Sequence, residues 1–289
     1  MTVTSAADVP LAVLQSRLAE VGQWLPIDGD PHDTVGALLE RNSTGSLRLG
    51  YGGWRDLLLG VQYRNGEGAL ITAGGRAMKN VAGYDLTKFM VGQAGVFGRV
   101  VTITVRTYLR PVGAVLAEFP PDVRCLNRLL PTALKPQWAM LTADALLCGY
   151  LGDRRRVEYY AKSLAKITDP LPLQIRERAV DEDIAHRASV FRGPPHLQSF
   201  RASVPPMRIA EFVAGCQPDR WAADAAHGIV VGEMREAAHL ARVVDAARAV
   251  QGTAVVHPAI PQPGPTSEIL RRLKATIDPA QQLRPVANP

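Results

Sequence analysis

Three glycines in the first half of the chain have the spacing of a loop that approaches a ligand closely. Gly92, Gly95 and Gly98 recur at every third residue and are followed directly by the β-branched run 100–105. Because glycine has no Cβ, its backbone can come close to a flat ring or a phosphate and present N–H groups to it. A tight turn that leads into a buried strand has the same spacing, and the spacing alone favours that interpretation.

A polar loop and a short helix precede the glycines. The segment 74–80 opens with two glycines and ends with Lys79 and Asn80. Asp85 is then placed to cap a short helix that buries apolar residues over 86–90. The sequence therefore predicts loop, helix, loop and strand in this order.

Other residues that could do chemistry are scattered. The cysteines form no C-x-x-C pair, so neither an iron–sulfur cluster nor a zinc site is expected. The histidines are isolated and are more typical of hydrogen-bonded structural residues, and no Ser-His-acid order, P-loop or paired-carboxylate motif is present. The sequence thus predicts no metal site and identifies no catalytic residue. The residues are Cys125, Cys148 and Cys216, and His186, His196, His227, His239 and His257.

Composition indicates two ordinary domains. The chain has 289 residues, 47% of them hydrophobic, and a formal net charge of +6. No apolar run approaches the roughly 20 residues of a membrane-spanning helix, and the start MTVTSAADVP lacks signal-peptide features, so we expect a cytoplasmic protein without a transmembrane segment. The basic residues are dispersed, which favours phosphates, carboxylate substrates or an acidic partner over nucleic acid.

Helix and hairpin signals organise the chain up to Pro111. An apolar stripe at helical spacing predicts a helix over 11–21. A short helix is expected to begin at 33–37, followed by a polar turn at 42–45. Asn65-Gly66 predicts a hairpin between two short strands.

After Pro111, short strands and amphipathic helices alternate twice in the same order. This order predicts two ferredoxin-like β-α-β-β-α-β repeats. The stretch 177–196 is charged and then proline-containing, which predicts a linker or a lid between them, with 192–196 as the exposed connection. A last helix is expected over 267–277. The predicted elements are strands 114–119, 137–141, 145–151 and 171–176 with helices 122–130 and 154–167, then strands 197–203, near 221, 228–232 and 253–257 with helices 207–214 and 235–250.

The combined segments resemble a known flavin-binding family. KNVAGYDL, the loop VGQAGVFG and a strand ending in LRP resemble the vanillyl-alcohol oxidase or PCMH type of FAD-binding domain, and within it the FAD-binding subunit of bacterial glycolate oxidases. Residues 33–37 and 42–45 are similar to segments that pass beside the flavin in that family. The resemblance implies an α+β fold with three parts: a partial PCMH-type FAD-binding domain at 1–112, an α+β cap domain at 113–258, and a C-terminal helix at 259–289 that returns to the FAD-binding domain.

The resemblance also implies which part of the family's domain is present. TVTSAADVPLAVLQSRLAEVGQWLPID resembles the start of the second flavin subdomain, so we expect the first subdomain, which carries the family's pyrophosphate loop, to be lacking. On that expectation the isolated chain holds FAD weakly or not at all. Arg99 and Arg284 stand where the family has a small aliphatic residue and asparagine. The implied FAD-contacting residues are Thr34, Gly36, Thr44, Gly45, Lys79, Asn80, Gly83, Tyr84, Gly95, Gly98 and Val100.

Two functions remain open from the sequence. The resemblance implies an FAD-binding subunit of a glycolate or other 2-hydroxy-acid oxidase complex. Such a subunit passes electrons from substrate through flavin to the redox centres of its partners, which are a catalytic flavoprotein subunit and an iron–sulfur subunit. The alternative is a non-catalytic structural subunit with a degenerate flavin fold that no longer binds FAD. The resemblance places either in the cytoplasm, peripheral to the inner membrane through its partners.

Overall fold

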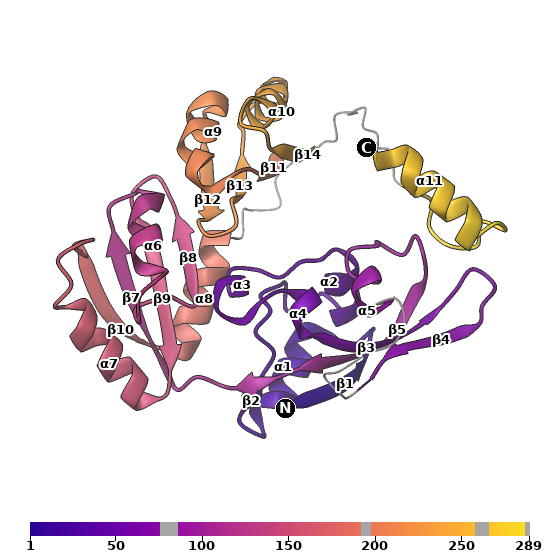
Figure 1. Ribbon diagram of the computed structural model, residues 1–289, viewed down its shortest axis with the longest axis horizontal. Helices are drawn as coiled ribbons and strands as arrows, with labels where there is room; N and C mark the ends of the chain where they lie inside the picture. The colour runs from indigo at the N-terminus through magenta and orange to yellow at the C-terminus, as the bar shows by residue number, and fades with distance from the viewer. Residues whose placement is uncertain (76–85, 192–197, 258–265, 287–289) are drawn as a thin grey trace. The chain divides into compact units, whose positions relative to one another are not determined.

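The computed structural model describes residues 1–75, 86–191, 198–257 and 266–286. The chain divides into two compact units, Met1–Arg110 with Pro261–Pro289 and Pro111–Ile260 (Figure 1). Each unit combines helices with antiparallel sheet, which confirms the predicted α+β fold class. The two units are described separately.

The first unit is built on a four-stranded antiparallel sheet with the strand order β1-β5-β3-β4. The predicted hairpin joins β3 to β4, and the Asn65 side chain closes it by accepting the N–H groups of Glu67 and Ala69 at 3.1 and 2.9 Å. The strands are β1 (Thr2–Ala6), β3 (Leu58–Arg64), β4 (Leu70–Gly74) and β5 (Arg99–Arg106), with a separate ribbon of β2 (Gln23–Trp24) and β6 (Tyr108–Leu109).

The helices of the first unit follow from apolar stripes and caps in the sequence. α1 buries Leu11, Leu14 and Leu18, whose spacing places them on one face of a helix. α2 begins after Thr34, whose Oγ1 accepts the Ala37 N–H at 3.2 Å. The helices are α1 (Leu11–Ala19), α2 (Val35–Glu40), α3 (Arg48–Tyr51), α4 (Trp54–Leu57), α5 (Leu86–Phe89) and α11 (Thr266–Ile277).

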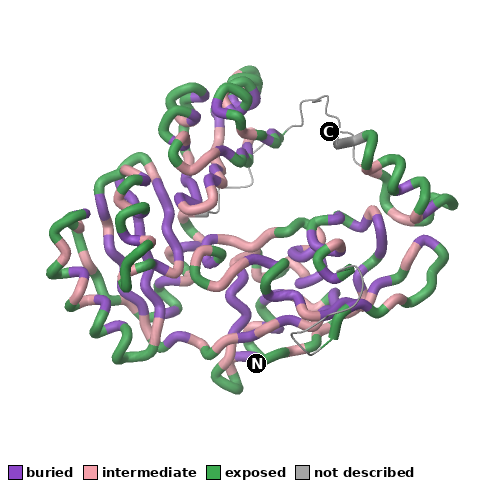
Figure 2. The backbone as a smooth tube through the Cα atoms, in the orientation of Figure 1, coloured by how far each residue is buried: buried purple, intermediate pink, exposed green. Residues whose placement is uncertain are grey.

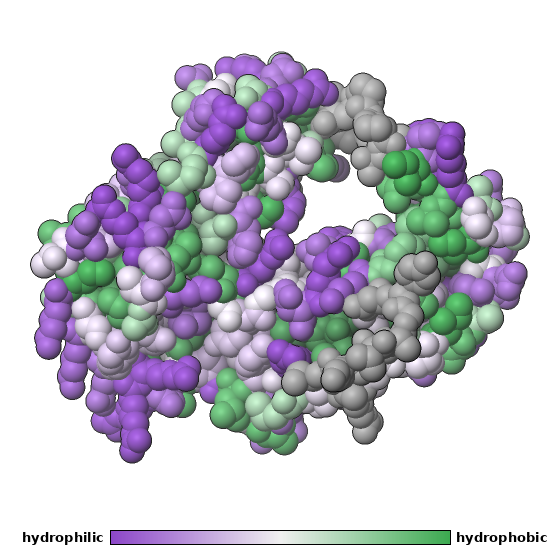
Figure 3. Space-filling view, viewed as in Figure 1, coloured by the Kyte–Doolittle hydropathy of each residue, from purple (hydrophilic) through white to green (hydrophobic). Residues whose placement is uncertain are grey.

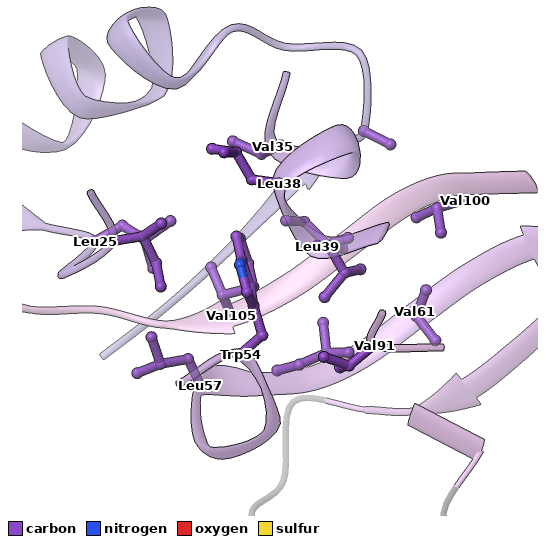
Figure 4. Close-up of a cluster of buried hydrophobic side chains, with 14 of the residues drawn as sticks. Leu25, Val35, Leu38, Leu39, Trp54, Leu57, Val61, Val91, Val100 and Val105 are labelled. Atoms are coloured by element: carbon purple, nitrogen blue, oxygen red, sulfur yellow. The ribbon is translucent and has the colours of Figure 1, made fainter. Parts of the chain in front are cut away.

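One hydrophobic cluster forms the core of the first unit (Figure 4). Leu39 of α2 belongs to it together with Val61 of β3 and Val105 of β5. Trp54 is fully buried in this cluster, and its Nε1 donates to the Ser43 carbonyl at 2.8 Å, so the only polar atom of the indole is satisfied. The tube in Figure 2 shows buried positions along the strands and the inner sides of the helices.

A row of polar side chains crosses all four strands of this sheet. The hydroxyls of Thr4 and Thr104 lie 2.9 Å apart across β1 and β5. Gln62 of β3 accepts a hydrogen bond from Thr102 at 3.0 Å and donates one to Thr72 at 3.2 Å. The sheet therefore has a packed face and a polar face, as antiparallel sheets commonly do.

The second unit contains one continuous eight-stranded antiparallel sheet. Its order is β10-β7-β9-β8-β12-β13-β11-β14, and the halves join where β8 pairs with β12. In each half the first strand lies between the third and the fourth, which confirms the two predicted ferredoxin-like repeats. The strands are β7 (Gly113–Phe119), β8 (Trp138–Leu141), β9 (Leu146–Gly152), β10 (Gln174–Ala179), β11 (Ser199–Ser203), β12 (Arg220–Asp224), β13 (Ile229–Glu233) and β14 (Thr253–His257).

Two helices of the second unit, α6 and α7, begin at side-chain caps. Asp122 and Asp153 cap α6 and α7 by accepting the N–H groups of Arg124 and Arg156, both at 2.9 Å. Hydrophilic side chains cover the visible sides of α7 and α10 (Figure 3). The helices are α6 (Val123–Leu129), α7 (Arg154–Leu164), α8 (Val180–Phe191), α9 (Ile209–Cys216) and α10 (Leu240–Ala249), with short 3-10 turns at Pro206–Arg208 and Ala237–His239.

The stretch 177–196, predicted to be a linker or a lid, has regular structure in its described part, and the exposed connection predicted at 192–196 lies outside the described residues. Its described part, 177–191, contains the end of β10 and all of α8. Asp183 and Arg187 lie one helical turn apart and are buried, at 0% and 1% exposed, with Arg187 Nε 2.9 Å from Asp183 Oδ2. Asp183 also accepts the Nε1–H of Trp138 at 3.2 Å. For 177–191 the linker prediction is wrong, because charges that pair inside a protein have the same sequence signature as charges in solvent.

Candidate functional site

The segment that the sequence singles out connects β4 to β5. β4 ends at Gly74 opposite Gly60 of β3, whereas β5 begins at Arg99 opposite Arg64, at the other end of β3. β4 and β5 therefore run in the same direction on either side of β3. α5 lies in the connecting segment and contacts both β3 and β4. The predicted site residues Lys79, Asn80, Gly83 and Tyr84 lie outside the described residues.

Residues 92–98, here called the glycine loop, fold around one buried side chain. Gln93 is 6% exposed. Its Oε1 accepts the Phe97 N–H and its Nε2 donates to the Gly98 carbonyl, both at 2.9 Å. Sequence reasoning missed Gln93, although a lone amide side chain among glycines and apolar residues was the available signal.

The glycine loop is tied to the C-terminal end of α2. The N–H groups of Gly92 and Ala94 donate to the carbonyls of Leu39 and Glu40, both at 3.0 Å. The structure thus brings the glycine loop against α2. The bonded residues Glu40 and Ala94 lie more than 40 positions apart in the sequence.

An ion pair from the C-terminal segment closes the glycine loop on one side. Lys274 of α11 donates from Nζ to the Val96 carbonyl at 2.8 Å and also to the Asp278 carboxylate. The Asp278 carboxylate accepts two further hydrogen bonds, from the N–H groups of Gln282 and Leu283 at 2.9 and 3.0 Å. We call Lys274, Asp278 and Arg284 the C-terminal clasp.

The other contacts of the clasp are made at glycines. Arg284 lies over Gly95, with its Cδ 3.1 Å from the position that a Cβ on Gly95 would take. A Cβ on Gly66, in the β3–β4 hairpin, would lie 3.0 Å from Cγ of Asp278. A side chain on either glycine would therefore press against the C-terminal segment.

Electrostatics favour the charged form of the clasp. The hydrogen bond from Lys274 is the main cause that lowers the pKa of the Asp278 carboxyl, and the N–H groups of Leu283 and Gln282 act in the same direction against desolvation. Lys274 and Asp278 are 8% and 1% exposed. The pair is thus held away from solvent with its hydrogen-bonding capacity largely used within the chain.

Gly36 is packed against the end of β1. Its N–H donates to the Ala7 carbonyl at 2.8 Å, and a Cβ on Gly36 would lie 2.7 Å from the Ala7 Cβ. Real Cβ atoms do not approach this closely, so only glycine fits here. Thr34, two residues earlier, uses its hydroxyl as the N-cap of α2.

The polar turn at 42–45 is anchored on Asp28. Asp28 Oδ2 accepts the N–H and the hydroxyl of Ser46 at 3.0 and 2.7 Å, and the Asp28 N–H donates to the Thr44 carbonyl at 3.2 Å. Gly45 has φ +78°, and a Cβ there would overlap the Asp28 side chain. The turn is therefore held in place by the Asp28 carboxylate.

Gly98 and Val100 lead into β5 beside Tyr63 of β3. Val100 is buried and pairs with Tyr63 in the sheet. A Cβ on Gly98 would lie 2.5 Å from Cδ2 of the Tyr63 ring and 3.2 Å from Cε of Met90. The absence of a Cβ at Gly98 therefore leaves room for the Tyr63 ring.

These contacts test whether the described residues fit a flavin. At each of the predicted glycines that the structure describes, the space that a Cβ would fill is taken by the chain itself. At these described glycines, residues of the chain itself therefore lie on the side where a Cβ would stand. The FAD-contacting set stays a prediction, since four of its members lie in 76–85. The occupying residues are Ala7 at Gly36, Asp28 at Gly45, Arg284 at Gly95 and Tyr63 at Gly98.

Titratable groups elsewhere in the described residues are dispersed. No group of three or more His, Cys, Asp or Glu side chains among them could hold a metal ion. Cys148 and Cys216 are buried, and burial raises the pKa of both thiols, that of Cys216 to about 11. Desolvation lowers the pKa of His186, which favours its neutral imidazole. In the same part of the chain no helix is long and apolar enough to cross a membrane.

No protein-family model matches the chain. Glycolate oxidase subunit GlcE of Escherichia coli (strain K12) is 35% identical over 115 residues, which are 38% of this chain and 33% of that protein. The mitochondrial D-lactate dehydrogenase (cytochrome) of Arabidopsis thaliana is 33% identical over 109 residues, which are 37% of this chain and 19% of that protein. The chain thus spans a third or less of the length of these two relatives.

A solved structure extends the similarity to nearly the full chain. Alkyldihydroxyacetonephosphate synthase superposes with a TM-score of 0.68 over 99% of this chain and 64% of that one, at 14% identity. At this identity the likeness shows a shared fold. It covers both units of the chain.

Proposed function

The relatives and structural neighbours point to the FAD-binding oxidase family of the PCMH type, and we propose that this chain acts there as one subunit of a 2-hydroxy-acid oxidoreductase of the glycolate oxidase kind. Two named relatives support the substrate class, because glycolate and D-lactate are both 2-hydroxy acids. The first of them is itself named a subunit, which supports a role within a multi-subunit enzyme.

The observation that carries the proposal is the convergence of two separate segments. The sequence resembles the flavin family at 33–37 and 42–45 and again at 74–111. In the first unit these regions meet where Leu39 and Glu40, which lie between the first two segments, accept hydrogen bonds from Gly92 and Ala94. Chance similarity in two distant segments would not require them to meet in the fold, so their contact supports a common architecture with the family.

The fuller form of the proposal gives this chain an FAD site that is completed by a partner. Oxidation of a 2-hydroxy acid to the 2-oxo acid releases two electrons and two protons, and a flavin supplies a two-electron acceptor for such reactions. On this proposal the contacting residues are the set named from the sequence, and the electrons move on to redox centres of a catalytic flavoprotein subunit and an iron–sulfur subunit. The complex works in the cytoplasm, at the inner face of the membrane through its partners.

A specific observation favours a second candidate, a structural subunit that does not bind FAD. At the four described glycines of the predicted set, the space that a Cβ would take lies against Ala7, Asp28, Tyr63 and Arg284. A glycine loop that is packed against its own chain can persist for the stability of the fold alone. Flavin content separates the two candidates, because only the first retains FAD in the assembled complex.

Co-purification tests the proposal. The tagged chain is isolated from its native cells, and mass spectrometry identifies the proteins that remain bound through a salt wash. We expect a flavoprotein and an iron–sulfur protein in stable ratio, and 2-hydroxy-acid oxidation by the complex with an artificial electron acceptor. A single-species monomer that oxidises glycolate unaided would overturn the subunit role, as would a chain that co-purifies with neither protein.

A further inference from the structure

β1 is an edge strand with a groove beside it. In the four-stranded sheet β1 pairs with β5 on one side, and none of the described strands pairs with the other side. A groove of about 380 Å³ runs between this strand and α1. It is lined by the whole of β1 and by residues of α1 and its flanks, among them Val9, Leu14, Leu18 and Val21.

The backbone of β1 has polar groups directed at the open edge. The Met1 carbonyl accepts the Thr107 N–H at 3.0 Å, and the Ala7 N–H donates to the Val101 carbonyl at 2.9 Å. Alternate residues of an antiparallel strand bond to the same neighbour. In this register the odd-numbered residues bond to β5, so Thr2 and Thr4 direct their N–H and C=O groups away from the sheet. These groups have the spacing that one more strand requires.

The groove also indicates the side chains of its occupant. Apolar side chains of α1 and its flanks form part of its lining, and one of them, Val21, remains 64% exposed. Arg17 lines the groove from α1, is exposed, and forms no ion pair with a carboxylate of the described residues. An added strand would turn alternate side chains into the groove. Apolar residues fit those positions, and an acidic residue fits the position beside Arg17.

We propose that the groove binds an extended segment of a partner polypeptide, which adds a strand to β1, places alternate apolar side chains against α1 and pairs an acidic side chain with Arg17. This is recognition by β-strand addition, in which main-chain hydrogen bonds give affinity and alternate side chains give specificity. A second copy of β1 matches poorly, because TVTSA has one large apolar residue, Val3, and no acidic residue. The proposal does not depend on flavin binding.

Fluorescence anisotropy tests it with the full chain and a labelled peptide of alternating valine and threonine that ends in glutamate. Thr4→Pro removes an N–H that faces the open edge and leaves the bonds to β5 in place, so we expect affinity to fall about tenfold or more. Thr4→Val keeps the N–H and is the matched control. Arg17→Glu should weaken binding by about fivefold or more through charge repulsion. Arg155→Glu, an exposed change of the same charge on α7, should leave binding unchanged.

Circular dichroism establishes that each variant is folded, and if Thr4→Pro does not fold, Arg17→Glu alone decides. Binding that weakens with Arg17→Glu and survives Thr4→Val and Arg155→Glu supports the proposal. Absence of peptide binding by the unaltered chain would overturn it, and so would equal affinity in all variants. A concentration-dependent dimer that Thr4→Pro abolishes would assign the edge to a second copy of the chain and would overturn it too.

Discussion

The glycine loop and the groove beside β1 belong to the same unit, but the backbone groups of the loop are hydrogen-bonded within the chain, whereas those along the edge of β1 point away from the sheet. In the loop the N–H groups of Gly92, Ala94 and Phe97 are bonded within the chain, and Lys274 takes the Val96 carbonyl. Along β1 the groups of Thr2 and Thr4 face an edge that none of the described strands covers. Glycine spacing alone therefore does not mark a ligand site, whereas an open edge beside an apolar groove marks a place for a further chain.

The largest expected effect is a difference in stability between substitutions at two neighbouring glycines, Gly74 and Gly75, where the chain leaves β4. Gly74 has φ +71°, and a Cβ there would overlap the Leu59 carbonyl oxygen, whereas a Cβ on the neighbouring Gly75 meets nothing within 4 Å. We expect Gly74→Ala to lower the free energy of unfolding by about 3 kcal/mol and Gly75→Ala to change it by about 0.5 kcal/mol or less. Urea unfolding followed by circular dichroism measures both. Equal stability of the two variants would contradict the packing described for this turn.

The next effect concerns the side chain at the centre of the glycine loop. Gln93→Leu removes the partners of the Phe97 N–H and the Gly98 carbonyl, both of which lie in a buried turn. We expect a loss of about 2 kcal/mol in the free energy of unfolding. Gln282→Leu, which changes an exposed amide, is the control and should change stability by about 0.5 kcal/mol or less. A neutral Gln93→Leu would show that the loop does not depend on this side chain.

Loss of the clasp should open the C-terminal segment locally. Asp278→Ala removes the acceptor of Lys274 and of two backbone N–H groups, so the segment after α11 should become accessible to a protease. We expect cleavage within 266–286 to be about tenfold faster, because local openings precede cleavage. Glu268→Gln, on the exposed side of the same helix, is the control. Unchanged cleavage of Asp278→Ala would show that the clasp does not hold the C-terminal segment.

The pH dependence of the clasp follows from the lowered pKa of Asp278. A carboxyl whose pKa is lower in the folded state stabilises the fold above its unfolded pKa, about 3.9, and this contribution is lost as the pH falls through the lower folded value. Protease resistance of the C-terminal segment should therefore be constant from pH 7 to about pH 5 and fall only in stronger acid. A loss of resistance near pH 6 would contradict this assignment.

The smallest expected effects lie in the open groove. Val21→Ser and Arg17→Glu alter exposed side chains that line it. We expect each to change the free energy of unfolding by about 0.5 kcal/mol or less. Thermal unfolding measures this, and a drop of several degrees in either variant would show that the chain itself fills the groove.

Local patterns in the sequence predicted most of the fold. The stripe of Leu11, Leu14 and Leu18 predicted α1, Asn65-Gly66 predicted the β3–β4 hairpin, and the repeated order after Pro111 predicted both halves of the eight-stranded sheet. α8 was missed because its buried Asp183–Arg187 pair resembles a solvated surface in sequence.

Contacts between distant residues could not be predicted in the same way. Lys274 meets the Val96 carbonyl across 178 residues, and Arg284 covers Gly95 from the last part of the chain. The sequence indicates that Gly95 needs space beside it, but spacing does not say whether a cofactor or another part of the chain occupies it. If FAD binds, Gly95→Val should abolish flavin retention, because a branched side chain would occupy the space of the ring. The position of Arg284 gives a second reason for that variant to perturb the loop.

The flavin content of the isolated chain tests the central claim most directly. That claim is that the chain's own residues close the glycine loop, so the chain alone does not retain FAD. The purified chain is incubated with excess FAD, passed through a desalting column and examined by its absorption spectrum, with protein and flavin quantified together. We predict flavin far below one equivalent per chain. Tight retention of one FAD per isolated 289-residue chain would contradict the claim.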